Sequence, residues 1–133
     1  MGAPRGHRSG RGIPAGGRFG LVRYNAGGTL DSTFGGDGRV TTNFTADWDI
    51  ATGIALQADG DVAVGEANNL KFAVARYNAD GTPDVTFGGD GKATTNFTPT
   101  VDFAWDVSLQ GDGKIVVVGG ARGRFAVARY MSG

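Results

Sequence analysis

The sequence predicts an all-β protein made of tandem four-stranded repeats of about 53 residues, which form the blades of an incomplete β-propeller ring. Three observations lead to this fold class. The chain repeats its own sequence at a fixed spacing, its apolar residues alternate over short runs as they do in strands, and turn-forming residues separate these runs. No stretch of ten or more residues has helical periodicity.

The internal repeat is the strongest of these signals. Phe19, Phe72 and Phe125 lie 53 residues apart, and the arginine and tyrosine that follow each of them keep the same spacing. Aligning residues 19–71 with residues 72–124 without gaps gives 26 identities in 53 positions, which chance does not supply. A fixed period of this length is typical of propellers and other repeat architectures.

The strands of one complete blade are predicted in chain order. From the innermost to the outermost strand, the expected ranges are 51–57, 61–65, 72–77 and 92–97. The alternation is clearest at the end of the chain, where Phe125, Val127 and Arg129 fall on one face of a strand. Ile115 begins a run of four β-branched residues, which predicts a strand buried on both faces, and the Asp-Gly pair before this run predicts a hairpin.

The chain holds more than one blade but too few blades to close a ring. The remaining predicted strands are 19–24 and 39–44, half of a preceding blade, and 104–110, 114–119 and 125–130, three strands of a following one. Propellers close with about four to eight blades, so we expect either a longer parent protein or several assembled copies. The domain boundaries predicted are a disordered Gly/Arg-rich tail at 1–18 and a repeat domain at 19–133, with repeats 19–71 and 72–124 and a partial repeat 125–133.

Composition argues against several classes of function. Basic and acidic residues number 13 each, but residues 1–18 contain four arginines and no acid, which leaves 9 basic and 13 acidic residues in the repeats. We therefore expect no nucleic-acid partner. The absence of cysteine excludes disulfides and thiolate chemistry, and no apolar run is long enough to span a membrane. No signal peptide is recognisable in this chain.

Three segments of the chain resemble the delta-60 repeat family. They are Phe-Ala-Val-Ala-Arg-Tyr-Asn-Ala-Asp-Gly-Thr (72–82), Thr-Phe-Gly-Gly-Asp-Gly-Lys (86–92) and Leu-Gln-Gly-Asp-Gly-Lys-Ile-Val-Val (109–117). The resemblance implies tandem β repeats of propeller-like architecture in a long bacterial protein, with a surface or extracellular location. It brings no catalytic residue. The chain departs from the pattern where Asp61 stands in the place of the basic Lys114, which suggests a degenerate or terminal copy.

The glycine-rich turns contain the candidate metal ligands. Asp31 and Asp37 in the first repeat, and Asp84 and Asp90 in the second, could contribute to a calcium site. Two carboxylates per loop are few for calcium, and Gly-Gly-Asp-Gly is typical of a turn that needs positive φ angles. We therefore favour a structural turn and predict no metal site and no cofactor.

Other repeated charges admit a functional and a structural interpretation. Arg23, Arg76 and Arg129 recur at one strand position, where they could form an anion-binding ring, but a strand arginine more often pairs with a nearby acid or aromatic ring. Asp49 and Asp102 could act as the acid and base of a glycosidase. Because they recur beside a strand in different repeats, we expect turn caps.

The repeated residues are turn formers and core residues, so we expect a non-catalytic structural or binding module from a larger propeller-like protein. Its partners would be neighbouring repeats, further copies of the chain, and protein or glycan ligands. The alternative is a fragment of a propeller enzyme, a lyase or hydrolase. The only histidine, His7, lies outside the repeats, which counts against that alternative.

Overall fold

The computed structural model describes residues 18–44, 49–57, 60–66, 71–99 and 102–131, and within 60–66 it describes the backbone and the Val62 side chain. The described residues form strands, turns and bends, without a helix. Nearly all of the tail expected at 1–18 lies outside them. No described helix is long and apolar enough to cross a membrane.

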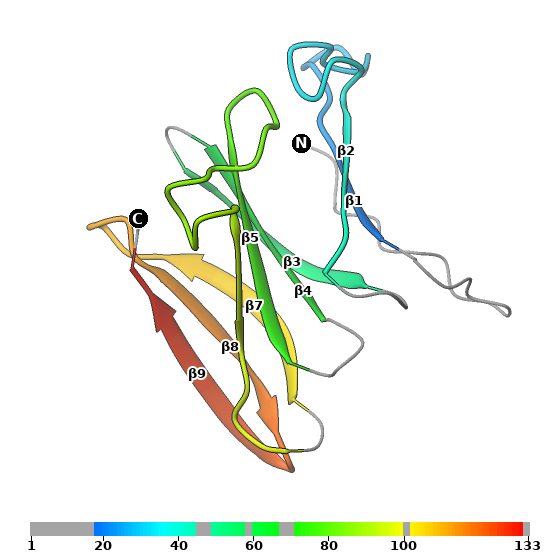
Figure 1. The fold of residues 1–133 in the computed structure, drawn as a ribbon. Helices are drawn as coiled ribbons and strands as arrows, with labels where there is room; N and C mark the ends of the chain where they lie inside the picture. The colour runs from blue at the N-terminus through cyan, green and yellow to red at the C-terminus, as the bar shows by residue number, and fades with distance from the viewer. Residues whose placement is uncertain (1–17, 45–48, 58–59, 67–70, 100–101, 132–133) are drawn as a thin grey trace, which may run out of the picture.

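The strands form three separate antiparallel sheets that lie side by side (Figure 1). The first sheet pairs β1 (Phe19–Val22) with β2 (Arg39–Thr42). The second contains β3 (Ile50–Gln57), β4 (Gly60–Glu66), β5 (Phe72–Asn78) and β6 (Lys92–Thr95), and the third contains β7 (Asp102–Leu109), β8 (Ile115–Ala121) and β9 (Arg124–Tyr130). The prediction of one complete four-stranded blade, half a blade before it and three strands after it is confirmed, and the sheets do not close into a ring.

The pairing of β8 corrects the gapless comparison of the repeats by one residue. Ile115 pairs with Tyr130, as Asp61 pairs with the equivalent Tyr77, so Ile115 and not Lys114 occupies the place of Asp61. The cause is the hairpin before β8, in which the Gln110 amide donates to the Lys114 carbonyl oxygen (2.9 Å) around a turn of three residues. Only two residues separate the paired ends of β3 and β4, Gln57 and Gly60. Gly113 has a φ of 87°, as the longer turn requires.

The one-residue shift decides which residues of β8 enter the core. A slip of one residue exchanges the two faces of a strand. Ile115 and Val117 are fully buried against the middle sheet, while Val116 is half-buried and Val118 is exposed on the outer face. The four β-branched residues are therefore split between two faces, and the prediction that the strand is buried on both faces is wrong for the outer one in this chain.

The middle sheet is covered on both sides, which explains why residues 72–77 of β5 are all buried. Phe72 and Val74 pack with Ile115 and Val117 in one cluster. Tyr77 and Ala75 pack on the other side with Phe19, Leu21 and Phe34 of the first repeat. Neighbouring sheets are also joined by hydrogen bonds between hydroxyl groups, Tyr77 with Thr42 and Tyr130 with Thr95.

A long folded loop follows the third strand in each of the first two repeats, at residues 25–38 and 78–91. Each loop contributes one buried phenylalanine, Phe34 in the first and Phe87 in the second. Gly35 and Gly88 hold φ angles of 68° and 67° at equivalent positions, a conformation that side-chain-bearing residues rarely adopt. The Gly35 amide donates to the Asp80 carbonyl oxygen (2.8 Å), so the first loop also binds the second. Both loops lie near one end of the sheets (Figure 1).

Candidate functional site

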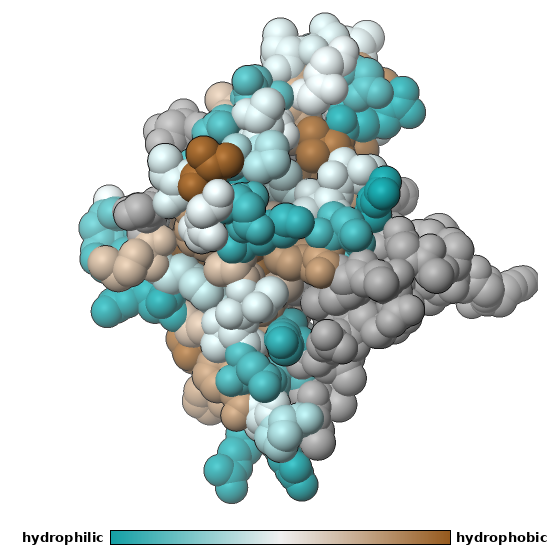
Figure 2. All heavy atoms as spheres, in the orientation of Figure 1, coloured by the Kyte–Doolittle hydropathy of each residue, from teal (hydrophilic) through white to brown (hydrophobic). Residues whose placement is uncertain are grey.

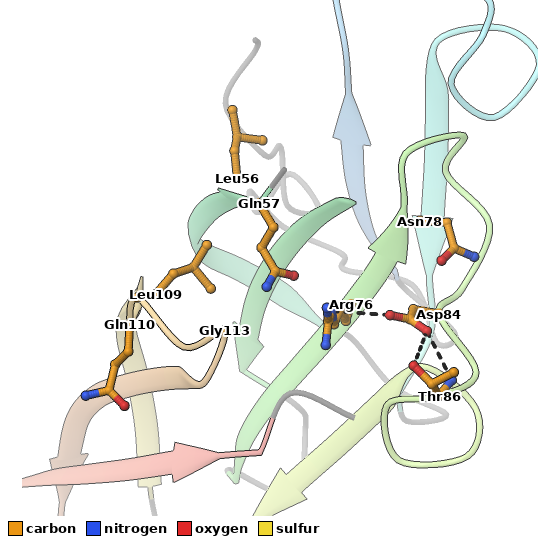
Figure 3. Close-up of a pocket in the computed structure, with 10 residues that line it drawn as sticks. Leu56, Gln57, Arg76, Asn78, Asp84, Thr86, Leu109, Gln110 and Gly113 are labelled. Atoms are coloured by element: carbon orange, nitrogen blue, oxygen red, sulfur yellow. Dashed lines mark hydrogen bonds and ion pairs between the residues drawn. The ribbon is translucent and has the colours of Figure 1, made fainter. Parts of the chain in front are cut away.

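A groove opens between the middle sheet and the third sheet, at the end where the folded loops lie (Figure 3). Its volume is about 820 Å³. Its walls come from the β3–β4 and β7–β8 hairpins and from the second folded loop. The lining residues are Leu56, Gln57, Arg76, Asn78, Asp84, Thr86, Leu109, Gln110, Gly111 and Gly113. Most of the polar groups among them are neutral amides or hydroxyls.

The repeat places equivalent residues on the two hairpins. Leu56-Gln57 ends β3, and Leu109-Gln110 stands at the end of β7, 53 residues later. Because neighbouring sheets are aligned side by side, both pairs line the same groove. Leu56 is exposed and Leu109 is half-buried, so each hairpin brings an apolar side chain next to an amide.

The charges in the groove are paired. The Arg76 Nε lies 3.3 Å from the Asp84 Oδ2, and both side chains are largely buried. The Asp84 Oδ1 accepts hydrogen bonds from the Thr86 amide (3.0 Å) and hydroxyl (2.6 Å). The Thr86 hydroxyl lowers the pKa of Asp84 most; burial opposes this, and the Thr86 amide and the Arg76 charge lower it further. Asp84 is therefore ionised at neutral pH and bound to a fixed cation.

Gln57 is the polar group of the groove that the protein leaves incomplete. Its Oε1 atom is buried and accepts no hydrogen bond among the described residues. Asn78, by contrast, donates through its Nδ2 to the Thr82 hydroxyl (2.9 Å) and the Pro83 carbonyl oxygen (3.3 Å). A buried acceptor without a donor costs about 1–3 kcal/mol, so a ligand that brings an N–H or O–H group to Gln57 regains this energy.

The four aspartates proposed as calcium ligands act in the turns. Asp31 has the geometry of Asp84: its Oδ1 accepts from the Thr33 amide and hydroxyl, and its Oδ2 accepts from the Arg23 Nε (2.8 Å). Asp37 and Asp90 each accept from the backbone amide two residues later, at 3.0 Å. No group of three or more His, Cys, Asp or Glu residues suited to a metal ion occurs in the described part of the chain.

The repeated arginines are not brought together in a ring. Arg23 pairs with Asp31, and its guanidinium lies 4.5 Å from the centre of the Phe34 ring. Arg76 forms the equivalent ion pair in the groove, and Arg129 is exposed on the outer face of β9. The first two arginines therefore have the structural role that we favoured.

The buried aspartates Asp49 and Asp102 cap turns instead of facing each other. The Asp49 Oδ2 accepts the Phe44 amide, and the Asp102 Oδ2 accepts the Phe97 amide, both at 2.7 Å. Burial raises the pKa of Asp102, but the hydrogen bonds from Phe97 and Thr98 outweigh it, so the net shift is downward. This geometry is that of a repeated cap, in agreement with the structural interpretation.

The groove itself was not predicted from the sequence. Its only signal was the recurrence of Leu-Gln at both hairpins, which is equally consistent with a structural role. The pairing of the sheets was needed to show that Gln57 and Gln110, from different repeats, line one depression.

The fold and the repeated loops define the class of protein, a β-propeller repeat protein whose sheets are not closed into a ring. A family model described as a β-propeller domain of unknown function (DUF5122) matches residues 15–34, 57–87 and 110–133, together more than half of the chain. The chain belongs to this family. The starts of the second and third matches, and the ends of the first and second, are 53 residues apart, so the family unit recurs in the register of the repeat. A comparison with curated proteins gives no match.

Proposed function

We propose that this chain is a non-catalytic binding module of the delta-60 repeat type, which binds an extended, uncharged peptide segment of a partner protein in the groove between the middle and third sheets. The observation that carries the proposal is the buried Gln57 Oε1, which accepts no hydrogen bond from the part of the chain that the structure describes and lies in a groove lined by amides. The resemblance to delta-60 repeats supports a place for this module in a longer protein at the cell surface or outside the cell.

The chemistry of the lining favours a peptide. A side-chain amide offers a donor and an acceptor together, as does each peptide group, and Leu56 and Leu109 offer apolar contacts on either side. The ion pair of Arg76 and Asp84 compensates the charges, so a charged ligand would lose hydration without gaining a counter-ion. The described lining residues include no aromatic ring on which a sugar could stack, which makes a glycan the weaker candidate.

The same residues support a non-catalytic role. Asp84 is the carboxylate of the groove, and its lowered pKa makes it a poor proton donor at neutral pH. Its two oxygens already accept hydrogen bonds or an ion pair from Thr86 and Arg76. A general acid or a nucleophile at this position would first have to lose these contacts.

Binding is tested with short random peptides displayed on phage and, in parallel, with an array of glycans. We expect selected peptides to be uncharged, with binding measured by calorimetry. Selection of glycans alone would refute the peptide assignment, and release of hydrolysed or eliminated product from a bound probe would favour the alternative of a lyase or hydrolase.

Gln57→Leu is the decisive variant because it separates binding from stability. Replacing the Gln57 amide, whose buried Oε1 has no donor among the described residues, by an apolar side chain of similar size leaves the fold as stable or slightly more stable. Loss of one ligand hydrogen bond should weaken peptide binding by about tenfold, since about 1.4 kcal/mol corresponds to that factor. Val85→Ala, at an exposed residue outside the groove lining, is the control and should change neither property. Unchanged binding in Gln57→Leu would refute the site.

A further inference from the structure

Among the described strands that border a sheet, β9 is the one that is both long and regularly paired. β1, β2 and β6 have four residues each, and β3 and β7 each contain a shift in pairing register. β9 has seven residues and pairs with β8 without interruption. Short edges and edges of irregular register protect a sheet from pairing with further strands. β9 is therefore the edge on which an additional strand can pair.

The outer side of β9 carries backbone groups that no described strand pairs. In an antiparallel strand, the N–H and C=O groups of successive residues point to opposite sides, so β8 takes only one alternate set from β9. β9 borders the third sheet in Figure 1, and in Figure 2 apolar residues reach the surface at the lower left, along this sheet. The edge thus combines available hydrogen-bonding groups with exposed apolar side chains, among them Phe125 and Val127.

The repeat shows which kind of strand pairs at this position in the other two sheets. β1 and β5 are the repeat equivalents of β9, and they pair with β2 and β6, whose sequences are Arg-Val-Thr-Thr and Lys-Ala-Thr-Thr. The two registers agree, because Phe19 pairs with Thr42 and, 53 residues later, Phe72 pairs with Thr95. Phe125 is the next residue of this series. The repeat therefore specifies both the sequence and the register of a strand that fits β9.

A phenylalanine that follows each of these outer strands adds a side-chain contact. Phe44 stacks on Phe19 with 5.9 Å between the ring centres, and Phe97 lies edge to face against Phe72 at 4.9 Å. Phe19 and Phe72 have no exposed surface, whereas Phe125 is 84% exposed. Neighbouring sheets also cover the first two rings, so an outer strand accounts for part of this difference.

We propose that the edge of β9 binds an extended segment with the chemistry of β2 and β6, and that this segment is the fourth strand of a following repeat. It pairs antiparallel with residues 125–128 through backbone hydrogen bonds and places an aromatic ring on Phe125. The chemistry recognised is a basic residue, an aliphatic residue, two threonines and then Asn-Phe. This mode adds a strand to a sheet, whereas the groove offers side-chain amides, so the proposal does not depend on the groove.

The first test uses a synthetic peptide of residues 91–98, Gly-Lys-Ala-Thr-Thr-Asn-Phe-Thr, with blocked ends. We expect saturable shifts of the β9 signals in an NMR titration of the native chain, and slower hydrogen exchange of alternate β9 amides. A peptide of the same composition in scrambled order is the control and should not bind.

Backbone pairing is tested with two N-methylated forms of this peptide, one at Lys92 and Thr94 and one at Ala93 and Thr95. Only one alternate set of peptide N–H groups faces β9, so one form should lose binding and the other should keep it. Loss of binding in both forms, or in neither, would overturn the strand pairing.

The second test isolates the ring contact. Phe97→Ala in the peptide should weaken binding by about two- to tenfold, the range expected for one aromatic pair. Phe125→Ala in the protein should cause the same loss, with no further loss when the two changes are combined, because both remove one contact. Val85→Ala, at an exposed residue of the second folded loop, is the protein control and should bind the peptide normally. Additive losses would overturn the placement of the ring on Phe125.

Three other outcomes would overturn the proposal. The Gln57→Leu variant should bind the peptide as the native chain does, and a loss of binding there would place the peptide in the groove. Self-association of the native chain that the peptide reverses would mean that a second copy, and not a following repeat, supplies the strand. A native chain whose β9 signals do not respond to the peptide would refute the edge as a binding site.

Discussion

The repeat provides a matched pair of substitutions, Phe72→Ala and Phe125→Ala, which remove the same side chain from equivalent positions of neighbouring repeats. Phe72 has no exposed surface and lies between two sheets, whereas Phe125 is exposed on the outer face of the third sheet. Sequence alone treats the two residues as equivalent. The structure predicts that their contributions to the free energy of unfolding of the single chain differ by several kcal/mol.

The magnitude follows from burial. Truncating a fully buried phenylalanine costs about 3–5 kcal/mol, which includes the cavity that remains. Part of this cost is the edge-to-face contact of Phe72 with Phe97, whose ring centres are 4.9 Å apart; such pairs contribute about 0.5–1.5 kcal/mol. Truncating an exposed side chain usually changes stability by less than about 0.5 kcal/mol. We therefore expect a difference of at least about 2.5 kcal/mol between the two variants.

Urea denaturation followed by circular dichroism measures both variants, at a concentration at which light scattering finds single chains. Since domains of this size unfold with about 5–15 kcal/mol, Phe72→Ala can leave too little folded protein to fit, and Phe72→Leu then supplies a smaller loss in the same direction. Equal losses at Phe72 and Phe125 would refute the reasoning, because they would mean that the outer face of the third sheet is covered within one chain. Little loss at either position would mean that the middle and third sheets do not pack as described.

Three further predictions test the loops and the contacts between sheets. Burial raises the pKa of Tyr77 to about 12, against the lowering effect of its hydrogen bond with Thr42, so the stability associated with its neutral form is complete below pH 10.0 and is lost as the pH rises towards 12. The melting temperature should therefore fall in this window, less steeply in Tyr77→Phe than in the native chain, and as steeply as in the native chain in the exposed control Tyr24→Phe. Gly88→Ala should destabilise more than Gly89→Ala in thermal melts, because both glycines have positive φ but only a Cβ at Gly88 would collide with the Lys92 carbonyl oxygen; equal losses would refute this collision as the cause. Calcium should not shift the melting temperature, because the oxygens of Asp31 and Asp84 already accept hydrogen bonds and ion pairs, and a concentration-dependent rise would restore the calcium hypothesis.

The sequence predicted the strands well because each strand is a local pattern between turn residues. The expected range 72–77 became β5 at Phe72–Asn78, and the expected 51–57 became β3 at Ile50–Gln57. The expected range 39–44 was too long: β2 ends at Thr42, and the Phe44 amide donates a hydrogen bond to the Asp49 Oδ2. The fate of a side chain beyond the strand end depends on such a contact, which no alternation of apolar residues reveals.

The candidate site was harder to predict from the sequence because its walls come from residues that are distant along the chain. The ion pair of Arg76 and Asp84 is local to one repeat, like that of Arg23 and Asp31, but the groove that it lines forms only between two neighbouring sheets. The repeat indicates that Leu-Gln recurs, but not whether it recurs to bind a ligand or to complete a hairpin. The convergence of both hairpins on one groove is the observation that supports the proposed binding role.

The register of β8 shows why equal spacing in sequence does not guarantee equal environment. The hairpin before β8 is one residue longer than the hairpin before β4, and this single residue places Ile115 and Val117 inside, against Phe72 and Val74. Without the shift, the alternate residues Val116 and Val118 would face the middle sheet, and Ile115 would lie on the outer face of the third sheet. A shortened turn would therefore change both the core and the outer face. The length of this turn, more than the identity of the β-branched residues that follow it, decides which residues of β8 pack against the middle sheet.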